Sequence, residues 1–181
     1  MTKDRIPPGQ VQTTKWPVLH YGDVPHVDTT TWTFTVSGLA ERPFTLTYDE
    51  LLALPRTSVV CDIHCVTTWS RLHNRFEGVS VQAILQRAGV KPEARFCLVV
   101  AEQEFTTNLS LADLDRPENL IALKWGGEWL TPEHGWPARL LVPHLYFWKS
   151  AKWIRGFELL DKDIPGFWEQ NGYHMHGDPW T

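Results

Sequence analysis

Sulfur and nitrogen ligands are concentrated between residues 61 and 73. Cys61, His64 and Cys65 lie in one short stretch, and His73 follows closely. A thiolate binds soft or high-valent transition metals readily. Cys65 stands just past the end of a predicted strand, so it is better placed than Cys61 to point into a pocket. Of these two cysteines, Cys65 is therefore the better candidate for a metal ligand. The alternative is that the cysteines are small buried hydrophobic residues, as we expect for Cys97 in its apolar run.

Zinc binding is a second interpretation of the same residues, because Cys61, His64, Cys65 and His73 supply the right atoms. Structural zinc sites draw ligands from a cysteine knuckle and a second pair at a distance. His64 and Cys65 are adjacent instead, and adjacent side chains of an extended chain point to opposite faces. The spacing therefore disfavours zinc.

A second group of residues has the chemistry of an anion site. It combines a turn with a basic loop beyond the next strand, and it contains His134, Arg139, Lys149, Ser150, Ala151 and Lys152. Arg139 offers a rigid fork of donors, Lys149 and Lys152 add positive charge, and backbone N–H groups of the loop complete a phosphate cradle. The alternative is that the lysines are solvated and that Arg139 forms a surface ion pair.

The final segment, residues 161–181, has no helical or strand periodicity but is rich in aromatic residues and histidine. His174 and His176 would share one face of an extended chain, where they could bind a metal or donate to an anion. A frayed tail is the alternative. The aromatic density favours docking, so we expect an ordered loop that closes over something.

The elements that position these groups are mostly strands. Alternating polar and apolar residues predict a strand at 31–36, and the segment 43–47 is expected to be its hairpin partner. Thr47 and Glu50 have the spacing of a capping box, which opens a short helix ahead of Pro55. Further strands are predicted at 57–63, 95–101, 119–125, 138–143 and 152–160.

The clearest helical pattern covers residues 81–88. Ser80 precedes it, its apolar positions share one face, and Gly89 supplies a left-handed C-terminal cap. No repeat or linker divides the 181 residues of the chain. We therefore expect a single domain, 1–181, with an N-terminal arm at 1–27 that packs along its surface.

Charge and hydropathy exclude several classes of protein. The chain has 17 basic and 21 acidic residues and no dense run of Lys or Arg, so no nucleic acid partner is expected. It lacks a stretch of about 18 consecutive apolar residues, so no membrane span is expected. The N-terminal sequence has no apolar signal region or twin-arginine pair, and the cysteines are too sparse for a disulfide framework. We therefore expect a cytoplasmic protein.

Taken together, the motifs resemble the molybdopterin-binding domain of the sulfite oxidase family. The resemblance covers most of residues 16–160 and rests on motif order: Cys65 with Trp69-Ser70, the turn His134-Gly135-x-Pro137-x-Arg139, the strand end Val142-Pro143, and the run Lys149-Ser150-x-Lys152-Trp153. The opening KWPVLHYGDVP and the closing PGFWEQNGYHMHGDPW are similar to a short bacterial branch of sulfite oxidase-like proteins. The implied fold is α+β, with mixed β-sheets and few short helices.

The resemblance implies a site for the molybdenum cofactor, Mo-molybdopterin. Cys65 would be the thiolate bound to molybdenum, oriented by Thr67 or Ser70. Further cofactor contacts are implied in the arm, the middle of the chain, the turn and the basic loop, at His20, Tyr21, Thr107, Asn108, His134, Arg139, Ser150, Ala151 and Lys152. The candidates for substrate positioning or proton transfer are His64, Arg71, His73, His174 and His176.

The function implied is oxygen-atom transfer on a small, unidentified substrate. The haem and dimerisation domains of larger members do not fit in this chain, so an external electron-transfer protein is implied as a partner. The arm has no arginine beside Val18-Leu19-His20-Tyr21, where sulfite-oxidising members hold their substrate, and this argues against sulfite. The missing twin-arginine signal argues likewise against reduction of protein methionine sulfoxide. A non-catalytic carrier of molybdopterin is the alternative.

Overall fold

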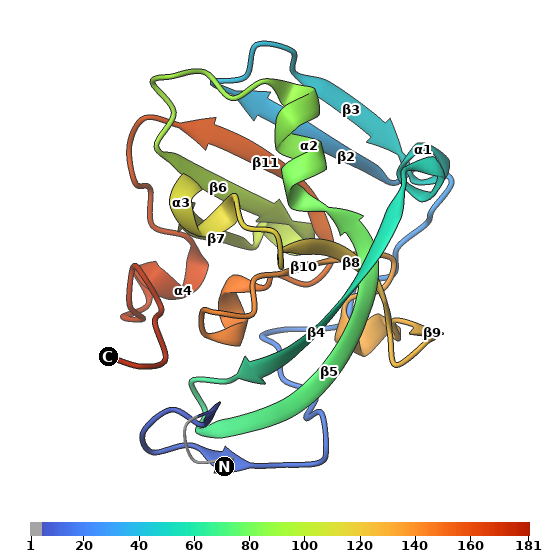
Figure 1. Cartoon of the computed structure of the whole chain (residues 1–181). Helices are drawn as coiled ribbons and strands as arrows, with labels where there is room; N and C mark the ends of the chain where they lie inside the picture. The colour runs from blue at the N-terminus through green and yellow to red at the C-terminus, as the bar shows by residue number, and fades with distance from the viewer. Residues whose placement is uncertain (1–4) are drawn as a thin grey trace.

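A computed structural model describes residues 5–181, so residues 1–4 of the predicted arm lie outside the described part of the chain. It contains two mixed β-sheets and a few short helices, which confirms the predicted α+β class (Figure 1). Parallel pairing joins β1 (Val11–Gln12) to β5 (Trp69–Ser80) in one sheet and β2 (Thr33–Gly38) to β11 (Ile154–Leu160) in the other. The other pairs of these sheets are antiparallel.

The five-stranded sheet is completed by β3 (Phe44–Thr47), β6 (Phe96–Ala101) and β7 (Thr106–Ser110). Its strand order is β3-β2-β11-β6-β7. The predicted hairpin of 31–36 with 43–47 is confirmed, because Phe34 lies opposite Leu46 in an antiparallel register. Alternate residues of β2 and β6 are buried, as expected for strands with one face on the core.

The six-stranded sheet adds β4 (Arg56–His64), β8 (Leu120–Trp125), β9 (Glu128–Trp129) and β10 (Arg139–Leu141) to β1 and β5. The long hairpin of β4 and β5 runs down one side of the molecule and ends beside the N-terminal arm (Figure 1). Sequence patterns do not predict β5. Its buried positions include Ser70 and Asn74, so the apolar alternation that signals a strand is interrupted.

Two helices begin and end where their capping residues predict. In α1 (Tyr48–Ala53), the capping box of Thr47 and Glu50 is formed in both directions. α2 (Val81–Ala88) begins at Ser80 and ends at Gly89, whose φ of 65° is left-handed. Two helices of one turn, α3 (Leu111–Leu114) and α4 (Phe167–Gln170), are not predicted by the sequence. No helix within residues 5–181 is long and apolar enough to cross a membrane.

The main core lies between the two sheets, and a smaller second cluster lies along the β4–β5 hairpin. The second cluster contains Ile63, Phe76, Leu120, Ala122, Leu141 and Phe147. Trp16 of the arm packs on this second cluster. Its ring centroid lies 5.6 Å from that of Phe76 and 5.9 Å from that of Phe147. Apolar burial therefore fixes the described part of the arm against the sheet, next to the cavity described below.

Candidate cofactor pocket

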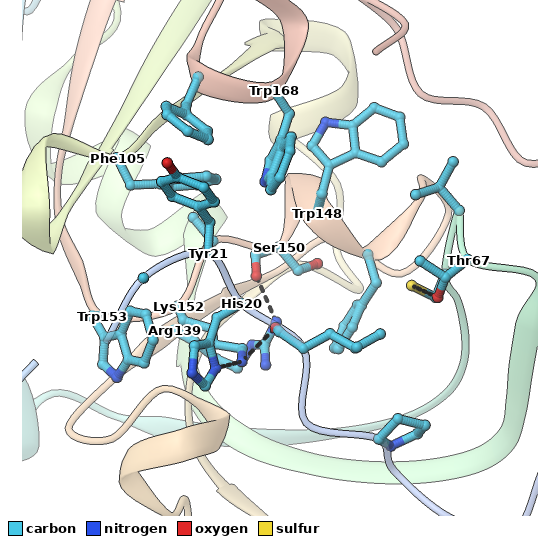
Figure 2. Close-up of a pocket in the computed structure, with 18 of the residues that line it drawn as sticks. His20, Tyr21, Thr67, Phe105, Arg139, Trp148, Ser150, Lys152, Trp153 and Trp168 are labelled. Carbon is cyan, nitrogen blue, oxygen red and sulfur yellow. Dashed lines mark hydrogen bonds between the residues drawn. The ribbon is translucent and has the colours of Figure 1, made fainter. Parts of the chain in front are cut away.

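A cavity of about 520 Å³ opens beside the second core cluster (Figure 2). It is lined by the arm, the turn between β4 and β5, the loop between β6 and β7, the stretch 139–153 and the C-terminal segment. This volume suits an organic cofactor. The predicted site residues that line it are His20, Tyr21, Cys65, Arg139, Ser150, Ala151 and Lys152.

Cys65 lies in a tight turn between β4 and β5. Its N–H donates to the carbonyl of Trp69 at 2.9 Å, and Thr68 donates back to the carbonyl of Cys65 at 3.0 Å. Gln10 of the arm donates to the same carbonyl at 2.8 Å. Cys65 Sγ lies 3.0 Å from Thr67 Oγ1. Because the backbone is held from both sides, the turn presents the thiol to the cavity in a defined position.

The other two cysteines do not line the cavity. Burial, with the charge of Asp62, raises the pKa of Cys61 to about 12. Cys97 lies in the main core, as predicted. In residues 5–181, no group of three or more His, Cys, Asp or Glu side chains is arranged to hold a metal ion. The zinc interpretation therefore finds no ligand set in this part of the chain.

Arg139 is a buried cation at one end of the cavity, with 1% of its surface exposed. It donates to the carbonyls of His134 at 2.9 Å and Ser150 at 2.6 Å. Its guanidinium lies 4.3 Å from the ring centroid of Phe147. Burial lowers the pKa of Arg139 to about 9, so the group is charged at neutral pH. The surface ion pair considered from the sequence is not formed.

Lys152 places a second cation at the same end of the cavity. Its Nζ donates to the carbonyls of Leu19 at 2.8 Å and Glu133 at 2.7 Å. Burial, with the charge of Arg139, lowers the pKa of Lys152 to about 7. Neither cation forms an ion pair within the described chain, and the hydrogen bonds named above all go to neutral carbonyls. Such an arrangement favours an anionic ligand, for example a phosphate group.

We expect anion binding at this end to weaken as the pH rises. Sulfate keeps its charge between about pH 6 and about pH 8, whereas Lys152 loses its proton around the middle of that range. Calorimetric titration with sulfate should therefore show falling affinity across the range. In Lys152→Met, the affinity at the acidic end should drop by about tenfold and the pH dependence should disappear. Lys162→Met, at an exposed position, is the control. Unchanged titrations in Lys152→Met would contradict the assignment.

Two histidines flank these cations. Burial and the charge of Lys152 lower the pKa of His20. Burial and the charge of Arg139 lower the pKa of His134 to about 4. His134 does not line the cavity, because its ring centroid lies 3.9 Å from that of Trp16 and its Nε2 lies 3.2 Å from the Trp16 carbonyl. In this structure His134 therefore contacts the arm and does not line the cavity.

Three residues expected near the substrate lie outside the cavity. His64 is buried behind the turn, where its Nδ1 pairs with Ser70 Oγ at 2.8 Å. Arg71 stacks over the Trp125 ring at 4.6 Å. His73 lies on the exposed side of β5, which carries it roughly 13 Å along the strand from the start of β5. His64 and Arg71 thus make structural contacts, and none of the three residues lines the cavity.

Lys149 does not belong to the anion site predicted from the sequence. It forms a fully buried ion pair with Glu169 at 2.7 Å and donates to the carbonyls of Asn108 at 2.8 Å and Met175 at 2.7 Å. Thr107 Oγ1 donates to the same Glu169 oxygen at 2.6 Å. Thr107 and Asn108 lie on β7 and serve this cluster, outside the cavity. In this structure the two residues anchor the C-terminal segment and do not line the cavity.

The C-terminal segment is docked on the domain through residues 174–177 as well as through Glu169. Tyr146 N–H donates to the carbonyl of Gly177 at 2.7 Å, and His176 Nε2 lies 3.2 Å from a carboxylate oxygen of Asp113. His174 packs edge-on to Trp148, with ring centroids 6.1 Å apart. Neither histidine lines the cavity. Their contacts fasten the segment and do not support the predicted metal or anion role.

Sequence reasoning misses the aromatic residues on the side of the cavity away from the cations. They are Phe105, Trp148, Phe167, Trp168 and Tyr173. Each is indistinguishable in sequence from a core residue. The one available signal is the aromatic density of 161–181, which favours docking without indicating what the segment covers.

The fold and the cavity define a class of protein: an α+β domain with a pocket for an anionic organic cofactor beside a cysteine thiol. This chain belongs to the oxidoreductase molybdopterin-binding domain family, whose model matches residues 21–168. The predicted resemblance to sulfite oxidase-like proteins is thereby confirmed.

Individual relatives agree with this family. The chain is 52% identical over 177 residues to an uncharacterized oxidoreductase, YuiH, of Bacillus subtilis, a match that covers 97% of this chain and 89% of that protein. It is 29% identical over 160 residues to a putative protein-methionine-sulfoxide reductase subunit, YedZ1, of Azospira oryzae, covering 87% of this chain and 61% of that protein. The sulfane dehydrogenase SoxCD of Paracoccus pantotrophus matches with a TM-score of 0.72 and 25% identity over 79% of this chain and 41% of that chain.

Proposed function

We propose that this protein is a molybdenum-cofactor-dependent oxidoreductase that transfers an oxygen atom to or from a small substrate. The observation that carries the proposal is the pairing, in one cavity, of a fixed thiol at Cys65 with two unneutralised cations, Arg139 and Lys152. When bound, the cofactor would supply a molybdenum centre capable of two-electron oxygen-atom transfer.

Different residues of the cavity would hold different parts of the cofactor. Cys65 would be the metal ligand, with its sulfur oriented by Thr67 Oγ1 at 3.0 Å. Arg139 and Lys152 would bind the phosphate by charge-assisted hydrogen bonds, and Arg139 is itself held by the Ser150 carbonyl. His20, Tyr21 and Ala151 complete the lining around the cofactor. The aromatic side chains exclude water from the same space.

A separate redox protein is the proposed partner in electron exchange. The names of the relatives support this part of the proposal. The Azospira relative is described as a reductase subunit, that is, as one chain of a larger assembly. The second protein compared is the sulfane dehydrogenase SoxCD. The chain spans 61% and 41% of these two proteins, respectively, so each has sequence that has no counterpart here.

Elemental and pterin analysis tests the proposal. Protein produced in a host that makes molybdenum cofactor should contain close to one molybdenum per chain, and its denatured supernatant should show pterin fluorescence. The alternative, a non-catalytic molybdopterin carrier, predicts the same analysis but no dye-coupled turnover of any substrate. A well-folded protein that carries zinc or no metal under these conditions would refute the proposal.

A further inference from the structure

The side of the cavity away from Arg139 is a continuous set of aromatic rings, which we call the aromatic wall. It consists of Tyr21 from the arm, Phe105 from the β6–β7 loop, Trp148, and Phe167, Trp168 and Tyr173 from the C-terminal segment. Figure 2 shows Tyr21, Phe105, Trp168 and Trp148 gathered on this side. The ring centroid of Phe167 lies 5.2 Å from that of Tyr21 and 5.9 Å from that of Phe105. The two ends of the chain therefore build one apolar surface.

Trp168 and Tyr173 form the centre of the aromatic wall. Their rings are stacked with centroids 4.9 Å apart and planes 18° from parallel, and Tyr173 N–H donates to the Trp168 carbonyl at 3.0 Å. Trp148 meets Tyr173 edge-on at 4.9 Å and donates from Nε1 to buried Glu169 at 3.2 Å. Both stacked rings are only half-buried. The stack is therefore preorganised and still offers apolar surface to a ligand.

The charges of the cavity are segregated from this wall. Figure 2 shows Arg139, Lys152 and His20 together at one end and Thr67, the neighbour of Cys65, at the other. The Arg and Lys side chains among the described lining residues are Arg139 and Lys152, and a cofactor phosphate would occupy both. The carboxylates of the lining are Asp23 and Glu102, and Glu102 is paired with Arg155 at 2.6 Å. An oxyanion substrate would therefore find no free cation there.

We infer that the substrate is an uncharged organic molecule with a flat apolar group, and that Trp168 and Tyr173 determine this specificity by packing against that group. The inference rests on the proposed function and adds the substrate class to it. An uncharged molecule has no need of a counter-charge near Cys65, and its apolar surface is removed from water on the rings.

Matched probes test the inference on protein whose molybdenum and pterin content has been measured. Methyl phenyl sulfoxide carries an aromatic ring, and dimethyl sulfoxide has a methyl group in its place. Nitrate is the oxyanion with which both are compared. In the reducing direction the S–O bond of the sulfoxide, or an N–O bond of nitrate, breaks. Reduced viologen dye supplies two electrons in one-electron steps, and two protons from the solvent convert the oxygen to water. In the oxidising direction, methyl phenyl sulfide is compared with sulfite, water supplies the oxygen, and ferricyanide accepts two electrons in one-electron steps.

The phenyl compounds are expected to be turned over with a kcat/KM at least about 100-fold higher than nitrate or sulfite. Tyr173→Leu and Trp168→Leu should raise the KM for the phenyl compound about tenfold with little change in kcat, because they remove binding common to ground and transition states. The KM for dimethyl sulfoxide should stay almost constant. Trp129→Leu is the matched control, since Trp129 is 44% exposed and lies outside the cavity.

Calorimetric binding of methyl phenyl sulfoxide gives a second readout that needs no turnover. The affinity should fall about tenfold in Tyr173→Leu and remain unchanged in Trp129→Leu. Tyr173→Phe, which keeps the ring, should bind like the wild type and serves if the leucine variants do not fold. A higher kcat/KM for nitrate or sulfite than for the phenyl compounds would overturn the inference. So would leucine variants in which the KM rises equally for methyl phenyl sulfoxide and dimethyl sulfoxide. Absence of molybdenum from the wild-type protein would instead refute the proposed function, and the binding comparison would still test the wall.

Discussion

Cys65→Ser is expected to leave the protein folded but without molybdenum, and to lower dye-coupled activity by more than about 100-fold. A serine hydroxyl is a hard donor that stays protonated at neutral pH, so it cannot replace a thiolate on the metal. The turn itself should survive, because its hydrogen bonds are made by the backbone of Cys65 and by Thr68 and Gln10.

The same variant should keep much of its affinity for the pterin phosphate. Arg139 and Lys152 make the phosphate end of the cavity, and neither contacts the thiol by a hydrogen bond. Metal analysis, pterin fluorescence and the dye assay on one preparation separate these effects. Cys61→Ser is the control, because Cys61 does not line the cavity and should retain metal and activity. Full molybdenum occupancy in Cys65→Ser would refute the assignment of the ligand.

Lys149→Met is expected to reduce the free energy of unfolding by about 3–5 kcal/mol, because it leaves the carboxylate of Glu169 buried without its cation. The side chains of Lys149 and Glu169 are fully buried, and Lys149 also donates to the carbonyl of Met175. The loss should therefore be greatest in residues 161–181, which this cluster anchors. Urea unfolding gives the free energy, and limited proteolysis or hydrogen exchange shows where the loosening occurs.

Two further variants make this prediction specific. Lys162→Met removes a lysine from an exposed position and should change stability by no more than about 0.5 kcal/mol. The double variant Lys149→Met/Glu169→Gln removes the unpaired charge and should recover part of the loss. If Lys149→Met were as stable as Lys162→Met, the buried ion pair would not be the anchor of the segment.

The contrast between Lys149 and Lys152 shows where sequence reasoning stops. Both lysines lie in the same short motif, and either could bind an anion. In the structure Lys149 ends a single turn of 3-10 helix, 147–149, and points into the protein toward Glu169. Lys152 follows the turn and points to the cavity beside Leu19. Lys149 has partners at Asn108, Glu169 and Met175, and Lys152 has partners at Leu19 and Glu133. Because these partners are all distant in sequence, no local pattern distinguishes the two lysines.

Local rules account for what the sequence determined by itself. The hairpin of β2 and β3, the capping box of α1 and the caps of α2 depend on residues close together in the chain, and all were predicted. The order of motifs indicated the family, and the strand end indicated Cys65. β5 was missed because Ser70 and Asn74 occupy buried positions and are satisfied there by hydrogen bonds, which interrupts the apolar alternation.

Only the tertiary structure decided which of the candidate residues share the cavity. His64, Arg71 and His73 lie close to Cys65 in sequence, yet the course of β4 and β5 and the contacts of these side chains take them elsewhere. Trp168 and Tyr173 are about a hundred residues from Cys65 and line the same space. Side-chain type and spacing determine which chemistry is available, but contacts between distant segments depend on packing the whole chain around its two cores. That packing brings the thiol, the two cations and the aromatic wall into one pocket.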